Sequence, residues 1–451
     1  MNRPALEAEL AAIVEQAFRG GRMPGLSVAV SVNGRRSAAN FGTLAVGSGV
    51  PMTPTARFQI GCITKVLTCM VAMQLAHQGR IDLDGAIVDY LPDLAAIPSG
   101  RDIRVRHLGT HTSGYRGLNP SSPEHGYFYS WEKFADFLRG TPQIFPPGSV
   151  FNYEHTECVI LGEVIRQVSG SSCAALTRDL IIEPLQLAVG SIERDGGQPE
   201  ARVADHSLDR GTGQFKPVRA VPYCSFWASS LSAMTASTMD LVMIGEVLGG
   251  LRSVPGICRQ AIDDVVRQAV ELPRSAGGPE REISPRSFGF GCAQYADGIF
   301  GHNGSARGQT CGLRFSPRHG VVVAVALNCW DPYARDSLLD SVLGALIPDA
   351  AAESDVPRIG LNLHPDELQG TYAGCVQGVE IVVTRSGDGL LCAITGLGGG
   401  GHRLNIEMTI DAAGELRARF PIKHLSAGFF REESTGAPAM LVGLNAFKKV
   451  S

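Results

Sequence analysis

Apolar and polar residues follow one another in patterns that predict two helices and a hairpin within the first eighty residues. Residues 1–21 carry apolar side chains at helical spacing with glutamates between them, which predicts an amphipathic surface helix rather than a signal peptide. Residues 25–45 predict two strands joined by Asn33-Gly34, a dipeptide that favours a two-residue hairpin turn. Residues 62–79 are apolar on nearly all sides and end in glycine, so we expect a buried helix there.

Further elements are predicted in the middle of the chain. Residues 160–170 and 237–250 show helical periodicity, and Ser237 is the expected N-cap of the second of these helices. Residues 301–328 predict two adjacent strands joined by a turn at residues 317–320. Because the helices lie between an early hairpin and a late one, without regular β-α-β alternation, the pattern favours an α/β fold of the α+β type. In such a fold an antiparallel sheet is flanked by helices.

The pattern changes near residue 350. Residues 349–360 are small, charged and proline-containing, as in a linker. The stretch that follows contains only short, turn-separated strands, which is typical of a small β-barrel or β-sandwich. We therefore predict one large domain over residues 1–350 and an all-β domain over residues 360–451.

Composition narrows the classes of function. The 40 basic and 44 acidic residues give a net charge of −4, so there is no basic surplus for a nucleic-acid partner. The longest apolar strand, residues 321–327, is too short to span a bilayer, and we expect a soluble cytoplasmic protein with no membrane partner. The eleven cysteines include no CxxC pair and no Cys/His cluster with zinc spacing, so they are interpreted as reduced thiols. No metal or organic cofactor is implied.

A nucleophile motif begins the apolar helix at Cys62-Ile63-Thr64-Lys65. Residues three apart lie on one helix face, so the thiol of Cys62 and the amine of Lys65 can meet. A helix N-terminus and a nearby cation both favour a thiolate, and a neutral amine could instead accept the thiol proton. In a chain with eleven cysteines the pattern by itself is weak, because it also arises by chance.

The Cys62–Lys65 pattern belongs to the first of three motifs that follow one another along the chain. FQIGCITKVLTCMVAMQLAHQGRIDLDGAIVDYLPDL is continued by IRVRHLGTHTSG, and PPGSVFNYEHTECVILGEVIRQVSG and Gly301-His302-Asn303-Gly304 follow in order. Over roughly residues 20–345 the chain resembles the serine β-lactamase and penicillin-binding-protein superfamily, in its class C-related branch of esterases, D-peptidases and transacylases. The resemblance implies a β-lactamase-like domain with an all-helical region, and we expect the C-terminal all-β domain to be lipocalin-like.

The resemblance also implies catalytic roles. Cys62 stands where the family has its nucleophilic serine, and Lys65 matches the motif lysine. Lys65 and Tyr153 would then shuttle the proton as general base and acid. The backbone N–H groups of Cys62 and Ser305 would form the oxyanion hole. His155 stands where the family carries asparagine.

Other residues are implied to contact substrate. His302 occupies the place of the lysine of Lys-Thr-Gly and, as in esterase-like members, belongs to the catalytic set. Substrate would be bound by Asn303, Gly304, Tyr127, Trp131 and Trp227. Aromatic packing beneath a long loop is an equal alternative for the three aromatic residues. His107 and His111 are expected to be structural.

The replacement of serine by cysteine leaves three explanations open. It is a natural nucleophile that forms a thioester, a substitution made to trap an intermediate, or the mark of a non-catalytic homologue. The first predicts an acyltransferase, in secondary metabolism, that moves an acyl group from an ester, thioester or amide to an amine or alcohol. Its partners would be a small-molecule donor and acceptor, with an acyl carrier or other thioester eligible as donor. The alternatives are a carboxylesterase or D-amino-acid peptidase and a non-catalytic binding protein, and the oligomeric state stays open.

Overall fold

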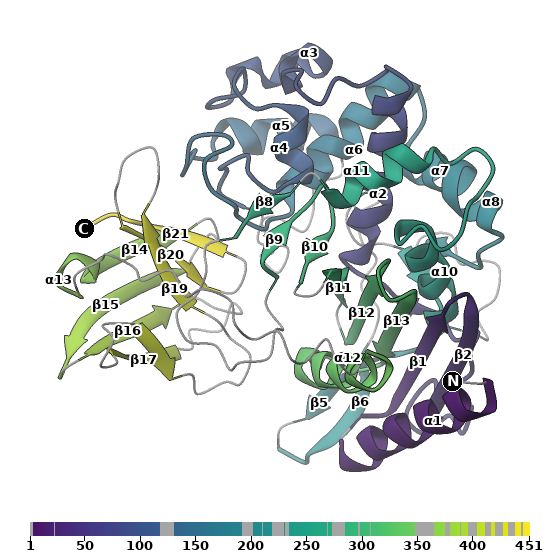
Figure 1. The fold of residues 1–451 in the computed structure, drawn as a ribbon. Helices are drawn as coiled ribbons and strands as arrows, with labels where there is room; N and C mark the ends of the chain where they lie inside the picture. The colour runs from purple at the N-terminus through teal and green to yellow at the C-terminus, as the bar shows by residue number, and fades with distance from the viewer. Residues whose placement is uncertain are drawn as a thin grey trace. The chain divides into compact units, whose positions relative to one another are not determined.

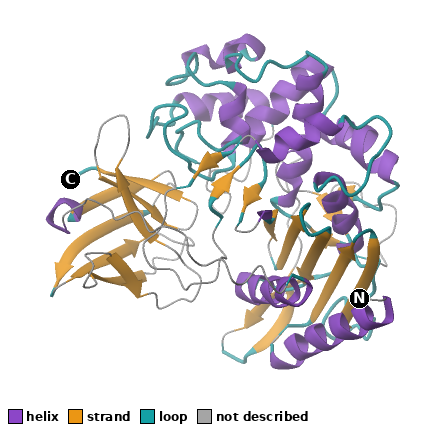
Figure 2. Cartoon of the chain, in the orientation of Figure 1, coloured by secondary structure: helices purple, strands orange, loops and turns teal. Residues whose placement is uncertain are grey.

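The computed structural model describes residues 3–451 with internal gaps (Figures 1 and 2). The gaps are residues 22, 118–129, 192–201, 210, 219–229, 231–233, 268, 273–284, 296–297, 307, 348–364, 375–378, 388, 396–403, 411–415, 420–426, 432–437 and 443–444. The predicted boundary between the two domains falls in 348–364 and so lies outside the described residues. By their contacts the described residues form two compact units.

The first unit comprises Met1–Arg80, Ser169–Arg267 and Gly291–Ala352. Its antiparallel sheet runs in the order β2-β1-β13-β12-β11-β10. These strands are β1 (Gly25–Val32), β2 (Arg35–Gly42), β10 (Ala293–Gln294), β11 (Phe300–Ala306), β12 (Gln309–Ser316) and β13 (Val321–Leu327). The predicted hairpin is confirmed, because Asn33 and Gly34 take φ values of +49° and +78° between β1 and β2.

Residues 301–328 form three strands, and the prediction of two was wrong. β11 pairs with β12 in addition to the predicted pairing of β12 with β13. β11 ends at Ala306 and β12 begins at Gln309, and Gly308 just before β12 has a φ of +91°. Only glycine adopts such a backbone readily, and this single-glycine turn was missed in the sequence.

Helices cover both faces of this sheet (Figure 2). Alternate residues of a strand point to opposite faces. One set of β1 and β13 residues packs with α1 (Arg3–Gly20) and α12 (Pro332–Leu346) in an apolar core that includes Val28, Val323 and Leu339. The other face receives α10 (Thr238–Leu248), whose Glu246 accepts a hydrogen bond of 2.7 Å from Ser31. The predicted cap of α10 is confirmed, because the Ser237 hydroxyl accepts from the N–H of residue 240 at 3.1 Å.

Helix α2 (Ile63–His77) of the first unit packs with α7 (Cys173–Thr177) and α11 (Arg259–Arg267). The helical turns η2 (Arg178–Ile182) and α8 (Glu183–Leu185) follow α7. Two small sheets complete the unit, one of β3 (Phe58–Gln59), β7 (Met234–Ala236) and β4 (Gly190–Ser191), the other of β5 (Asp205–Asp209) and β6 (Gln214–Val218).

The second unit comprises Ile81–Val168, Gln268–Phe290 and Glu353–Ser451. Its helical part contains α3 (Ile87–Tyr90), η1 (Pro92–Ala96), α4 (Val105–Gly109), α5 (Trp131–Arg139) and α6 (Thr156–Ser169), with the strand pair β8 (Val270–Glu271) and β9 (Ser287–Phe288). Among the described residues of the chain no helix is long and apolar enough to cross a membrane.

The C-terminal region is all-β as predicted, apart from the short helix α13 (Pro365–Leu368). Its antiparallel strands run in the order β18-β17-β16-β15-β14-β21-β20-β19. They are β14 (Gly370–Gly374), β15 (Glu380–Ser386), β16 (Gly389–Thr395), β17 (Leu404–Ile410), β18 (Leu416–Arg419), β19 (Ala427–Arg431), β20 (Pro438–Val442) and β21 (Asn445–Lys449).

The C-terminal strands pack on the loop that precedes α6. Phe145 and Val150 of this loop form a buried cluster with Ala439 of β20 and Ala446 of β21. The N–H of Ala446 also donates to the side-chain oxygen of Asn152 at 3.1 Å. Within the second unit the all-β region is therefore attached at the segment that leads to the predicted tyrosine.

Candidate active site

The start of α2 brings the predicted nucleophile and its lysine together. Cys62 occupies the N-cap position and is partly exposed, and Lys65 lies one turn later with none of its surface exposed. The amine Nζ of Lys65 donates to Sγ of Cys62 at 3.3 Å. Thirteen of the 15 residues of α2 are buried, which explains how a lysine is held without solvent around it. A cation beside a sulfur at a helix N-terminus is the setting of a reactive thiol.

Most other described thiols differ from Cys62 in their surroundings. None of the nine described cysteines forms a disulfide, and apart from Cys62 only Cys258 reaches the surface. Burial raises the pKa to about 12 for the thiols of Cys292, Cys311, Cys329 and Cys392. Thiols of this kind are inert packing groups. An alkylating reagent is therefore expected to distinguish Cys62 from them.

The third motif lies against the residues that precede Cys62. A methyl group added at Gly304 would meet the carbonyl oxygen of Ile60 at 2.0 Å. One added at Gly61, whose φ is +51°, would meet the backbone oxygen and nitrogen of Ser305 at 2.5 and 2.6 Å. Both positions need glycine, because only the missing side chains let the two backbones approach. This approach places the backbone of Ser305 beside that of Gly61, next to the predicted oxyanion-hole donor of Cys62.

The side chains of the third motif divide between the two faces of β11. His302 is 5% exposed and shares its face with Gly304, which packs on the segment before Cys62. Its Nδ1–H donates to the carbonyl oxygen of Asn303 at 2.6 Å. The side chain of Asn303 instead accepts from Arg314 at 2.9 Å and donates to Asp336 at 3.5 Å. Its assignment to substrate binding stays a prediction.

Tyr153 lies in the second unit, in the loop before α6. Its half-buried ring is 4.5 Å from that of His111, 6.0 Å from that of Phe288 and 6.2 Å from that of His155, measured between centroids. The ring of Tyr153 thus lies near that of His155, two residues later in the second motif. The structure also places His111 nearest to Tyr153 among these rings, which the sequence did not indicate.

The predicted aromatic contacts have different outcomes. Tyr127 and Trp227 lie outside the described residues. Trp131 begins α5, where its indole N–H donates to Asp93 of η1 at 2.6 Å and its ring packs on Phe134. This arrangement connects α5 to η1. The contact of Trp131 with substrate stays a prediction.

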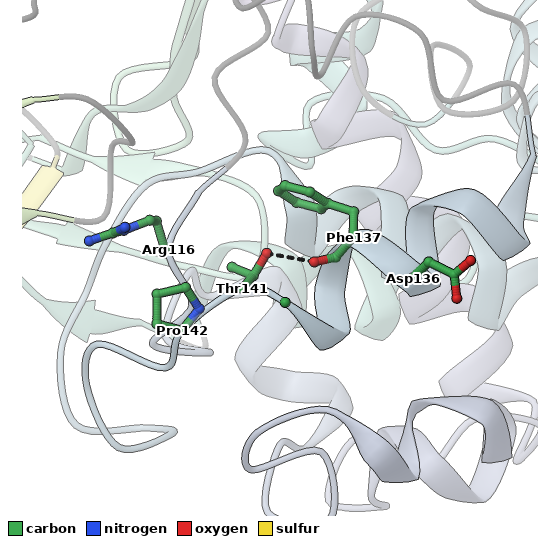
Figure 3. A pocket seen from close by; sticks show the side chains of 6 residues that line it. Arg116, Asp136, Phe137, Thr141 and Pro142 are labelled. Carbon is green, nitrogen blue, oxygen red and sulfur yellow. Dashed lines mark hydrogen bonds between the residues drawn. The ribbon is translucent and has the colours of Figure 1, made fainter.

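A cavity of about 340 Å³ lies in the second unit, and none of the predicted catalytic residues lines it (Figure 3). It is lined by Arg116, Asp136, Phe137, Gly140, Thr141 and Pro142. The hydroxyl of Thr141 is already used, because it donates to the carbonyl oxygen of Phe137 at 2.9 Å. In Figure 3 the Asp136 carboxylate points away from Arg116, so these two charges do not converge on one ligand position.

Comparison with known proteins establishes the family. Residues 10–344 match the family model named Beta-lactamase, so this chain belongs to the β-lactamase family. Penicillin-binding protein 4 of Amycolatopsis lactamdurans is 28% identical over 377 residues, which cover 78% of this chain and 93% of that protein. The chain is accordingly a β-lactamase-related enzyme acting on ester or amide bonds, and the resemblance seen in its motifs is confirmed.

Solved structures confirm the fold. The structure titled "Crystal structure of SurE" shares 24% identity with a TM-score of 0.76, and the match covers 100% of both chains. A class C β-lactamase from Rhodobacter sphaeroides shares 22% identity with a TM-score of 0.60, covering 75% of this chain and 99% of that one. The match to SurE includes the C-terminal all-β region, whereas the class C enzyme corresponds to about three quarters of the chain.

Proposed function

We propose that this enzyme forms an acyl-enzyme on Cys62 and transfers the acyl group to an amine or alcohol. The observation that carries the proposal is the hydrogen bond of 3.3 Å from the buried Lys65 amine to the Cys62 sulfur. The neighbouring backbone of Ser305, which lies against Gly61, supports it because an acyl transfer needs donors for the developing oxyanion.

The chemistry follows from these groups. The Cys62 thiolate attacks the carbonyl carbon of the donor, and a C–S bond forms while the carbonyl oxygen becomes an oxyanion. The N–H groups of Cys62 and Ser305 receive that oxyanion. As it collapses, the bond to the leaving group breaks, and the Lys65 ammonium supplies a proton through Tyr153. The acceptor then gives up its proton by the reverse route and attacks the thioester, which releases the product and the thiolate.

The sulfur nucleophile favours transfer over hydrolysis. A thioester reacts with amines, relative to water, more readily than an oxygen ester does. A cysteine at this position therefore suits an enzyme whose acyl group must reach an acceptor in the presence of water. This argument separates the proposal from the hydrolase alternative.

A D-configured acyl donor is the first class to test. Structures that share this fold are titled "Crystal structure of SurE with D-Leu" and "Crystal structure of D-stereospecific amidohydrolase from Streptomyces sp. another structure". Another is titled as a β-lactamase/D-alanine carboxypeptidase from Pseudomonas syringae. These titles guide the choice of probes, and N-acyl-D-aminoacyl thioesters with their L enantiomers form a matched set.

The test is intact-protein mass spectrometry after brief exposure to these thioesters and to activated esters. We expect a single acyl adduct on the wild type that is absent from Cys62→Ala and is discharged by an added amine. Cys258→Ala removes the other surface thiol among the described cysteines and is expected to keep the adduct. If the ratio of transfer product to hydrolysis product does not change when acceptor is added, the transferase assignment is contradicted and the hydrolase is favoured.

The same experiment separates the remaining explanations of the cysteine. If Cys62→Ser turns over esters while the wild type stays acylated even with acceptor present, the cysteine acts as a trap. No adduct on any variant, together with slow alkylation of Cys62, would favour a non-catalytic binding protein.

A further inference from the structure

A buried histidine packs directly on the predicted catalytic tyrosine. The rings of His111 and Tyr153 are 4.5 Å apart between centroids and inclined by 48°. Phe288 of β9 closes the arrangement, 5.2 Å from His111 and 6.0 Å from Tyr153. His111 is only 1% exposed, so packing fixes its ring. The fixed ring in turn restricts the positions open to the phenol ring beside it.

The imidazole of His111 is itself held by a carboxylate. Its Nδ1 lies 2.5 Å from Oε2 of Glu157 on α6, and the other oxygen of Glu157 accepts from the N–H of Ser113 at 2.9 Å. Burial, together with the nearby charge of Glu157, raises the pKa of Glu154 to about 8. Glu154 is thus largely protonated near pH 7.

The backbone of His111 is also joined to the tyrosine loop. His111 has a φ of +55°, a left-handed conformation that costs free energy for a residue other than glycine or asparagine. In this conformation its carbonyl oxygen accepts from the N–H of Asn152 at 2.8 Å, one residue before Tyr153. The ring of His111 therefore contacts Tyr153 directly, and its backbone is bonded to the residue before Tyr153.

We propose that His111, anchored by Glu157, is the positioning residue that orients the Tyr153 phenol for proton transfer. The inference rests on the proposed function, in which Tyr153 moves the proton, and it assigns His111 no contact with substrate. Among the described contacts of this cluster the titratable groups are His111 after α4, His155 before α6, Glu157 on α6, and Glu154, whose pKa responds to Glu157. Any pH effect must be interpreted against this set, since β9 contributes the apolar Phe288.

The variant His111→Asn separates positioning from folding. Asparagine tolerates a positive φ, and its amide can take the place of Nδ1 beside Glu157, while the imidazole ring that packs on Tyr153 is lost. His107→Asn is the matched control four residues earlier, where Nδ1 accepts from the N–H of Arg104 at 3.1 Å, as an asparagine oxygen can. Melting temperatures of both variants report any general loss of structure.

The kinetic measurement is a double-mutant cycle with Tyr153→Phe. The rate constant of Cys62 acylation by an alkyl ester, whose alkoxide leaving group must take up a proton, is followed by rapid-quench intact-protein mass spectrometry. We expect His111→Asn to lower this rate constant about 10- to 100-fold, with the half-saturating concentration unchanged within about twofold. In the Tyr153→Phe background His111→Asn should cause no further loss. Losses that multiply in full would overturn the inference, because His111 would then act independently of Tyr153.

A second measurement does not depend on catalysis. Tyrosine labelled with ¹³C at Cζ gives one resonance per residue, and the resonance that Tyr153→Phe removes belongs to Tyr153. We expect His111→Asn to move this resonance and its titration midpoint, and His107→Asn to leave both unchanged. An unchanged resonance refutes the positioning role even in an active enzyme. A moved resonance in a protein that never acylates supports the positioning and refutes the proposed function instead.

Discussion

Replacing Lys65 should slow acylation of residue 62 much less when that residue is a cysteine than when it is a serine. Lys65→Met removes the amine that donates to the sulfur at 3.3 Å, and methionine fills a similar volume at this fully buried position. The substrate is p-nitrophenyl acetate, whose leaving group departs without needing a proton. The rate of acylation then reports activation of the nucleophile alone.

The expected magnitudes follow from ordinary acid–base chemistry. An ordinary thiol has a pKa of about 8.5, so about 3% of it is thiolate at pH 7. A lysine that only keeps a sulfur ionised can therefore raise the rate at pH 7 by at most about 30-fold. A hydroxyl has no such ionised fraction, and general-base assistance contributes about 10²- to 10⁴-fold. We expect Lys65→Met to cost up to about 30-fold with Cys62 and at least about 100-fold in the Cys62→Ser background.

The assay is stopped-flow release of nitrophenolate between pH 6 and pH 9. It compares the wild type, Lys65→Met, Cys62→Ser and the double variant. With Cys62 the loss should shrink towards pH 9, where even an ordinary thiol is largely ionised. Lys133→Met, on the exposed side of α5, controls for the loss of one positive charge. A loss far above 30-fold that persists at pH 9 would refute the reasoning, because Lys65 would then do more than ionise the sulfur. A loss below twofold would refute the coupling itself.

Three further outcomes are expected. Gly304→Ala forces a methyl group onto a backbone oxygen 2.0 Å away, so the melting temperature and the acylation rate should both fall. Gly344→Ala in α12, with nothing within 4 Å, should leave the rate unchanged and raise the melting temperature slightly, because alanine favours a helix. Glu154 keeps its proton up to a pKa of about 8 in the fold but releases it near 4.5 when unfolded, so stability should fall as the pH rises through that window, and Glu154→Gln should flatten this slope in denaturant titrations. Asn152→Leu leaves the N–H of Ala446 without its acceptor, and chemical denaturation should show a loss of about 1–3 kcal/mol, whereas no loss would mean that this hydrogen bond is not formed.

Features encoded within a few residues were predictable from the sequence. The Asn33-Gly34 turn, the Ser237 cap and the face shared by Cys62 and Lys65 each depend on a spacing of four residues or fewer. The residue types fix the local backbone in each case, and tertiary packing then preserves it. The first two were predicted at the correct positions, and the approach of the lysine to the sulfur follows from helix geometry.

The features missed in the sequence depend on residues that are far apart or on a single backbone angle. His111 meets Glu157 across 46 positions of the chain, and no periodicity relates the two. α6 begins at Thr156 rather than at residue 160, because the Glu154 carboxylate accepts from the N–H groups of residues 156 and 157. A capping carboxylate just before the apolar run is the signal that would have found this start.

The tyrosine loop is held from two sides within the second unit. His111 accepts from the N–H of Asn152, while the side chain of Asn152 accepts from the N–H of Ala446 in the C-terminal sheet. One asparagine thus connects the buried histidine–glutamate pair and the all-β region at the residue that precedes Tyr153. Because Asn152 is 1% exposed, water cannot replace either partner without opening the packed loop. The C-terminal region is therefore best understood as part of the support for Tyr153 rather than as an appendage. Changes in β21 should alter the position of the Tyr153 phenol.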